Sequence, residues 1–316
     1  MTTDSPVVPP PPRRIVLPGG RTLVVRTVAL GDAAGLAALF AGLDGEGRNR
    51  RFFSAYRPPE AFVARMLTVA ERGGAGLVAV VQSDDEERIV GEAGYERLEN
   101  GDGELGITVD RSWRGWLGPY LLDALVEVAA SEGVPNLEAD VLATNGPMLA
   151  LVRSRGYAEI PTGDSTMVRM LLGVGTPTPT WPGTHDRPRV LVEGAGGRWR
   201  EKAAELQVLG CPGPGGRPAV CPLLAGEPCP LAAGADVIVV SRPPDAEPWR
   251  TLRAAHAAQA GVPVCVELVH PGDEVLTGEV PVSPGSKADV LRFVDRRALL
   301  GEPVPAEVSA LDEPVP

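Results

Sequence analysis

The chain has 316 residues, of which 44% are apolar, and a formal net charge of −11 at pH 7. Its length exceeds that of a usual single domain, so we expect two domains, each with a hydrophobic core. The negative charge argues against nucleic acid or an anionic membrane as the main partner, because both select basic surfaces, and it weakly favours a basic amine as substrate.

The sequence also predicts a compartment. It contains no run of 18 apolar residues, so no segment is expected to span a membrane. The N-terminal residues lack an apolar stretch of signal-peptide length, and four cysteines are too few for a disulfide framework. A reducing cytoplasm is therefore the expected location.

Proline-rich residues 1–14 predict a solvated arm before the first domain, which we expect over residues 15–172. This domain should open with two strands around a Pro-Gly-Gly turn, after which Asp32 can cap a helix. The charged residues 44–51 are expected to form a loop. A second helix should follow Pro58, and a hairpin with an acidic turn comes next.

Residues 104–145 organise the rest of this domain. Apolar residues alternate up to Val109, recur every three or four residues from Leu121, and then alternate again, which predicts strand, loop, helix and strand. Gly115 and Gly118 lie in the loop before the helix. A loop with few side chains lets backbone N–H groups approach an anion, and the helix dipole adds to the attraction, so the junction could hold a pyrophosphate.

This order of elements, with WRG before the helix and NGPMLALVRSRGY after the next strand, resembles the GNAT acetyltransferases. The segment RNRRFF is similar to a region of the bacterial protein-lysine acetyltransferase type. The resemblance covers residues 13–172. It implies an α/β fold with a central mixed sheet flanked by helices, acetyl-CoA as the cofactor, and an amine as the acceptor, either a protein lysine or a small molecule.

The resemblance also implies roles for individual residues. Arg51, Phe52 and Phe53 would border the acceptor pocket, although a solvated basic turn with two core aromatics is the alternative. An Asn at the start of a helix can cap it or reach the pantetheine arm of the cofactor. The implied cofactor-binding residues are Ile107, Thr108, Val109, Arg114, Gly115, Trp116, Gly118 and Asn145.

The glycine loop departs from the family pattern [QR]-x-x-G-x-[GA]. From Arg114 the chain reads Arg-Gly-Trp-Leu-Gly-Pro, which is one glycine short. Leu117 stands where that glycine is expected, and Pro119 has no N–H to donate to a phosphate. Trp116 could fill the space instead.

Two residues are candidates for proton transfer. Glu104 begins the central strand, where a carboxylate in a partly dry cleft could accept the proton of the amine; an exposed glutamate at a strand end is the alternative. Many family members carry a tyrosine as the acid for the leaving thiolate, but this chain has Leu151 there. The later Tyr157 is the remaining candidate, unless it only packs beside Gly156.

The second half of the chain predicts a different domain. Residues 173–187 are rich in proline and glycine and should form a linker, in which His185 is expected to be exposed. Strands alternate with helices over residues 188–300, including a helix over 198–210. This alternation predicts a small three-layer domain of flavodoxin or receiver type with a parallel sheet. Residues 301–316 form an acidic tail.

Three cysteines of the second domain, Cys211, Cys221 and Cys229, fall within nineteen residues. They could hold zinc or form a redox pair, but the segment has no C-x-x-C motif and no fourth ligand nearby. The alternative is that they are small buried residues of a tight loop.

The sequence thus predicts an acyltransferase that moves an acetyl group from acetyl-CoA to an amine. A module that has lost catalysis and senses a ligand or binds a protein is the competing hypothesis, and the unusual loop from Trp116 to Pro119 is the feature that separates the two.

Overall fold

The computed structural model describes residues 11–54, 60–83, 86–176, 178–193, 198–199, 205–211, 221–241, 249–259, 261–269 and 273–294. The predicted tail and most of the predicted arm lie outside these ranges. Among the described helices, none is both long enough and apolar enough to cross a bilayer.

The first half contains eight strands and five α-helices in its described part. The strands are β1 (Arg13–Val16), β2 (Thr22–Thr27), β3 (Ala75–Ser83), β4 (Glu86–Arg97), β5 (Gly103–Val109), β6 (Asn136–Leu142), β7 (Ala158–Ile160) and β8 (Met167–Gly173). The helices are α1 (Ala33–Ala41), α2 (Gly45–Phe52), α3 (Glu60–Leu67), α4 (Leu117–Ser131) and α5 (Gly146–Arg153). The predicted hairpin is confirmed, because β3 and β4 pair in antiparallel register from Ala75 and Tyr95 to Ser83 and Glu86.

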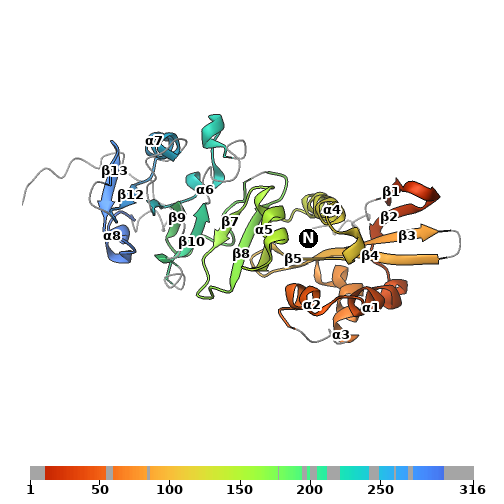
Figure 1. The fold of residues 1–316 in the computed structure, drawn as a ribbon. Helices are drawn as coiled ribbons and strands as arrows, with labels where there is room; N and C mark the ends of the chain where they lie inside the picture. The colour runs from red at the N-terminus through yellow and green to blue at the C-terminus, as the bar shows by residue number, and fades with distance from the viewer. Residues whose placement is uncertain are drawn as a thin grey trace, which may run out of the picture.

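These helices cover both faces of the sheet. Helices α1, α2 and α3 lie on one face of β2 to β5, and α4 lies on the other (Figure 1). The α4 face is the larger core, in which Leu121, Leu122 and Leu125 are fully buried against the sheet. On the opposite face, Leu36 and Phe40 of α1 pack on Val78 and Val80 of β3. Side chains alternate across each strand, so both faces of this sheet are filled.

Three local predictions were wrong. The charged residues 44–51 form most of helix α2, whose first turn is capped by the Asp44 carboxylate accepting from the Gly47 N–H at 2.6 Å. The sequence reading missed this helix because it has almost no apolar face. Strand β1 begins at Arg13, inside the predicted arm. Asp32 does not cap α1 through its side chain, because its carboxylate binds the Arg26 guanidinium at 2.7 Å instead.

The described residues of the second half continue the same sheet with five parallel strands. They are β9 (Arg189–Glu193), β10 (Gln207–Cys211), β11 (Val237–Val240), β12 (Val264–Glu267) and β13 (Glu279–Val282), with helices α6 (Pro230–Ala233), α7 (Trp249–Gln259) and α8 (Lys287–Leu291). Strand β10 replaces the end of the helix predicted over 198–210. The full order is β1-β2-β3-β4-β5-β6-β8-β7-β10-β9-β11-β12-β13. The chain therefore has a mixed α/β fold with one large mixed sheet.

The segment predicted as a linker is anchored to both halves. Thr180 donates its N–H to Asn136 Oδ1 at 2.9 Å in the first half, and the Trp181 indole donates to the Leu231 carbonyl at 2.8 Å in the second. His185 is exposed, as predicted, and its Nε2 lies 2.7 Å from Asp236 Oδ2. The two parts of the sheet meet at a single bridge between β7 and β10. The division into domains itself stays a prediction.

Candidate functional site

Strands β5 and β6 part soon after they begin. They pair in parallel only at Gly103 with Leu137 and at Glu104 with Glu138, whereas β5 stays paired with β4 along its whole length. Beyond Glu104, one edge of β5 thus faces a gap. A cavity of about 770 Å³, here called the splay cavity, fills this gap and extends to the start of α4 and to α5.

Backbone amides of β5 point into the gap. The Asp110 N–H donates to the Val90 carbonyl at 2.9 Å, which fixes the direction of that amide toward β4. Amide direction alternates along an antiparallel strand, so the N–H groups of Ile107 and Val109 face the splay cavity. Both residues line it. Donors without a ladder partner on that side are available to a bound oxygen.

The start of α4 lies at one end of this cavity. Gly115 has φ of +101°, a backbone conformation that glycine adopts without strain, and a Cβ built there would meet open space. Helix α4 has no side-chain cap, so the first amides of the helix are not used by a capping group. Gly115, Gly118 and Pro119 line the splay cavity, and Pro119 removes one donor from the first turn.

Leu117 does not occupy the space of the missing glycine. Its side chain is fully buried in the core below the helix, where Gly91 of β4 makes room for it. Trp116 is 42% exposed. The centroid of its indole lies 6.1 Å from the ring centroid of Trp113 and 6.4 Å from that of Tyr120. The indole is not among the groups that line the splay cavity. Neither bulky residue therefore closes the junction.

Arginines gather at the same end. Arg50 of α2 and Arg114 of the loop both line the splay cavity. The pKa of the Asp44 carboxyl lies below its usual value, mainly because the Gly47 N–H donates to it. The positive charges of Arg114, Arg111 and Arg50 lower this pKa further. Arg50 is ion-paired with Glu46 of its own helix, whereas Arg114 lines the splay cavity beside the N-terminus of α4, a combination that suits an anionic ligand.

A second cavity, of about 390 Å³, adjoins the first on the α3 side of the sheet and is here called the α3 cavity. Its apolar wall includes Phe62 and Met66 of α3. The two cavities share four lining residues, Arg51, Glu104, Leu105 and Gly106. A group bound in one cavity can thus reach a group bound in the other only past these residues.

A buried ion pair lies beside this junction. Glu92 of β4 is 1% exposed, and its Oε1 accepts from the Thr108 hydroxyl at 2.6 Å and from Arg51 Nε at 3.2 Å. The other oxygen, Oε2, is buried and has no hydrogen bond among the described residues. The sequence-based prediction missed Glu92, for which the available signal was a carboxylate flanked on both sides by small and apolar residues within β4. Its position in the α3 cavity makes it a candidate for proton transfer.

The three residues predicted to border the acceptor pocket have different surroundings in the structure. Arg51 stacks near the rings of Phe52 and Phe62, each 5.5 Å from its Cζ, and holds Glu92. Phe52 packs edge to face with Phe40 and Phe62 and belongs to the core. Phe53 is 45% exposed and lines the splay cavity.

Of the remaining predicted site residues, some line a cavity and one lies in the core. Glu104 is exposed and lines both cavities. Asn145 caps α5, accepting from the Met148 N–H at 3.4 Å, while it also lines the splay cavity. Tyr157 packs against the larger core instead of lining either cavity, and burial raises the pKa of its phenol.

Cys211, Cys221 and Cys229, the cysteines considered as metal ligands, form no metal site with other described residues. Cys211 ends β10, and Cys229 precedes α6 and is buried. Within the part of the chain that the structure describes, no three His, Cys, Asp or Glu side chains come together as a group that could hold a metal ion.

A parted pair of strands with a helix N-terminus at the base of the gap, within one large mixed sheet, makes this an α/β protein with a cavity between β5 and β6. Residues 46–157 match the model of the acetyltransferase (GNAT) family, and this part of the chain is a GNAT acetyltransferase domain. Proteins of this family use acetyl-CoA. The predicted resemblance is therefore confirmed for these residues.

Solved structures similar to the chain cover about half of it. They include the GNAT domain of S. lividans PAT (23% identity, 51% of this chain and 96% of that chain, TM-score 0.45). A ribosomal-protein-alanine N-acetyltransferase from Brucella melitensis has 22% identity over 46% of this chain and 97% of that chain (TM-score 0.38). The protein yncA from Salmonella typhimurium, solved with acetyl-CoA, has 16% identity over 48% and 94% (TM-score 0.40). No curated protein matches the chain.

Proposed function

We propose that the chain transfers an acetyl group from acetyl-CoA to an amine. The observation that carries this proposal is the splay cavity, which runs from the N-terminus of α4 to the junction with the α3 cavity at Arg51, Glu104 and Gly106. Such a continuous path lets a long carrier lie with its anionic end at the helix and its reactive end beside a second substrate.

The residues at the helix end suit the diphosphate of coenzyme A. Gly115 leaves open space for close approach of the backbone, and the amides at the start of α4 carry the positive end of the helix dipole. Arg50 and Arg114 would supply the charge that compensates for the donor lost at Pro119. When bound, the cofactor supplies an acetyl thioester that an amine can attack.

The strand amides would serve the thioester. The N–H groups of Ile107 and Val109 face the gap, where they can donate to the carbonyl oxygen as it gains negative charge. We assign no side chain to protonate the leaving thiolate. Leu151 has no proton to give, and Tyr157 packs in the core, so the proton would come from solvent.

Two carboxylates could take the proton of the amine. Glu104 lies at the junction, exposed, and is suited to attract an ammonium group from solvent. Glu92 is buried beside the junction with one oxygen unused, so an amine that reaches it would meet an acceptor already oriented by Thr108 and Arg51. We propose that Glu104 draws the amine in and that Glu92 or Glu104 accepts its proton before the nitrogen attacks.

We propose further that residues 188–300 form a flavodoxin-like domain. The five parallel strands lie in the order β10-β9-β11-β12-β13, in which the first strand in sequence, β9, lies between the second and third. This order supports the flavodoxin type over other parallel sheets.

The competing function is a GNAT module without catalysis. Pro119 favours it, because a helix that lacks one amide donor binds a phosphate less tightly. Calorimetric titration of the full chain with acetyl-CoA, followed by a thiol-release assay with a panel of amines, separates the two. Binding with release of coenzyme A supports the enzyme; no heat up to millimolar ligand contradicts it and favours the module.

A further inference from the structure

The α3 cavity contains charges that are only partly balanced. Glu92, Glu96 and Glu104 all line it. Glu96 pairs with Glu104 directly across β4 and β5, and Glu92 lies four residues before Glu96 on the same strand, so the three carboxylates project from one face of the sheet. Directly opposed like charges destabilise a sheet, so this arrangement needs a reason.

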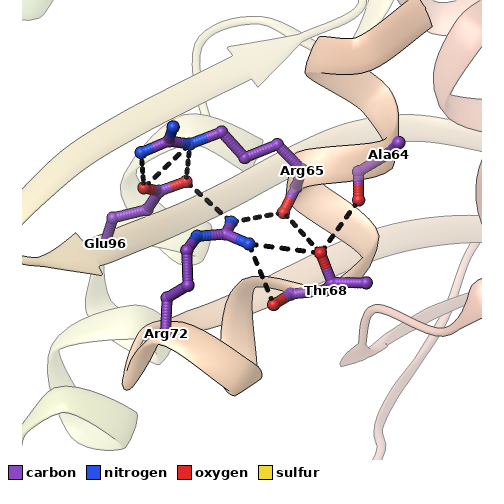
Figure 2. Close-up of polar contacts among 5 residues, drawn as sticks. All are labelled: Ala64, Arg65, Thr68, Arg72 and Glu96. Atoms are coloured by element: carbon purple, nitrogen blue, oxygen red, sulfur yellow. Dashed lines mark hydrogen bonds and ion pairs between the residues drawn. The ribbon is translucent and has the colours of Figure 1, made fainter.

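Two of the three carboxylates have cationic partners. Glu92 pairs with Arg51, and Glu96 is held by both Arg65 and Arg72, as Figure 2 shows. For Glu104, in contrast, the structure has no hydrogen bond or ion pair to any described residue. It is the carboxylate of this cavity that remains open to a cation from outside.

The two arginines at Glu96 are not equivalent. The Arg72 guanidinium also donates to the Thr68 hydroxyl and carbonyl and to the Arg65 carbonyl, so it is held against the backbone of the α3 segment (Figure 2). Arg65 donates to Glu96 through Nε and Nη2, and its Nη1 has no partner among the residues drawn. Arg65 lines the cavity and its side chain is 62% exposed, so Nη1 can donate to an incoming anion while Nε and Nη2 stay on Glu96.

Arg65 also lies within electrostatic reach of the open carboxylate. Glu96 first, and then Glu104, raises the pKa of the Arg65 guanidinium. Glu104 and the unused Nη1 donor of Arg65 thus line the same cavity. Deeper in the same cavity, the buried Glu92 Oε2 has no hydrogen bond among the described residues, and a donor on the ligand could satisfy it.

From this arrangement we infer that the acceptor is a zwitterionic amine of amino-acid type, with its ammonium at Glu104 and its carboxylate at Arg65. This inference rests on the proposed function and names its substrate class. The Phe62, Met66 and Val69 side chains line the same cavity and favour an apolar side chain on that acceptor. A lysine side chain, which has no carboxylate near its amine, would leave the Nη1 donor of Arg65 unused, with Arg65 bound to Glu96 alone.

Calorimetry on the full chain with leucine and with leucinamide tests this inference without acetyl-CoA. The two ligands differ only in the anionic group. Leucine is expected to bind at least about 10-fold more tightly than leucinamide, because a charge-assisted hydrogen bond to Arg65 is lost in the amide. Arg65→Ala should bring the two affinities together, Arg65→Lys should keep part of the difference, and Glu104→Gln should weaken both.

Arg88→Ala is the matched control, since Arg88 is an exposed arginine of β4, the strand that carries Glu92 and Glu96, and lines neither cavity. This variant should leave the ratio unchanged. Equal affinity for leucine and leucinamide, no binding of leucine, or a ratio unaffected by Arg65→Ala would each overturn the inference. The proposed function fails separately: leucine binding without acetyl-CoA binding would reject acetyl transfer but not the zwitterion site. Acetylation of a lysine peptide by a protein that does not bind leucine would support acetyl transfer and reject the zwitterion site.

Discussion

The Thr108 hydroxyl donates to Glu92 Oε1 over 2.6 Å, across the register pair that joins β4 and β5. Arg51 Nε lies within hydrogen-bonding distance of both residues, at 3.2 Å from Glu92 and 3.1 Å from Thr108. This triangle fixes one oxygen of a buried carboxylate that lines the α3 cavity, and the other oxygen has no hydrogen bond among the described residues. The residues next to the proposed acceptor are therefore already oriented before any ligand binds.

Glu92→Gln is expected to reduce kcat for acetyl transfer by about 10² to 10⁴, the usual contribution of a positioned base. Glu104→Gln should act mainly on KM, because Glu104 is exposed and meets the ammonium first. Steady-state kinetics with titration of acetyl-CoA separates the effects, since neither change should alter cofactor affinity. Glu99→Gln, at an exposed position in the turn after β4, is the control. A larger loss of kcat in Glu104→Gln than in Glu92→Gln would assign the base to Glu104.

Thr108→Val keeps the shape of the side chain and removes the hydroxyl that donates to Glu92. Losing one hydrogen bond to a buried carboxylate should lower the free energy of unfolding by about 1 to 3 kcal/mol, measured by urea denaturation. Thr144→Val changes an exposed threonine in the loop after β6 and should have little effect. Equal unfolding free energies in the two variants would show that the contact does not hold Glu92.

Gly106→Ala tests the junction of the two cavities. A Cβ at Gly106 would lie 2.8 Å from Arg51 Cζ, so the guanidinium must shift, which should disturb its contacts with Glu92 and Thr108. We expect a lower kcat with near-wild-type affinity for acetyl-CoA. Gly146→Ala adds the same methyl group where nothing lies within 4 Å, and it should retain activity. Unchanged kcat in Gly106→Ala would mean that Arg51 does not position the proton acceptor.

Pro119→Ala restores the amide that the first turn of α4 lacks. If this end of the cavity binds the diphosphate, the dissociation constant for coenzyme A should fall by about 10-fold, the effect of one hydrogen bond to a charged group. Arg114→Ala should raise it. Calorimetry measures both. A dissociation constant that does not respond to either change would place the diphosphate elsewhere.

Asp102 predicts a dependence of stability on pH. It is fully buried, and this burial raises the pKa of its carboxyl from 3.8 to about 6, although the Asn136 amide donates to it at 2.9 Å. A carboxyl that binds its proton more tightly in the folded state favours folding at low pH. Stability due to this group is therefore highest near pH 4 and falls by about 2 to 3 kcal/mol as the pH rises to 6 and above.

Asp102→Asn should remove this fall, because the amide stays neutral and can still accept from Asn136. The variant is expected to match the wild type in unfolding free energy at pH 4 and to exceed it at pH 7, as measured by urea denaturation at each pH. Asp186→Asn, at an exposed aspartate, should keep the wild-type profile. A wild-type profile in Asp102→Asn would show that Asp102 does not carry the effect.

The sequence by itself determined the order and type of the regular elements around the site. The alternation up to Val109, the helical spacing from Leu121 and the glycines before α4 are local patterns, and local patterns follow from the periods of strand and helix. The acetyltransferase character of residues 46–157 was predicted from motifs of the same local kind. Helix α2 was missed because its residues are nearly all polar.

Only the tertiary structure decided which side chains meet. Glu92, Thr108 and Arg51 lie 16 to 57 residues apart in sequence and come together because β4 and β5 pair in one register while α2 packs on that face. The position of Leu117 could likewise not be predicted from its own segment, because its side chain fits into the core only beside Gly91 of β4. Contacts of this kind depend on register and packing between distant segments, which the residues of one segment do not specify.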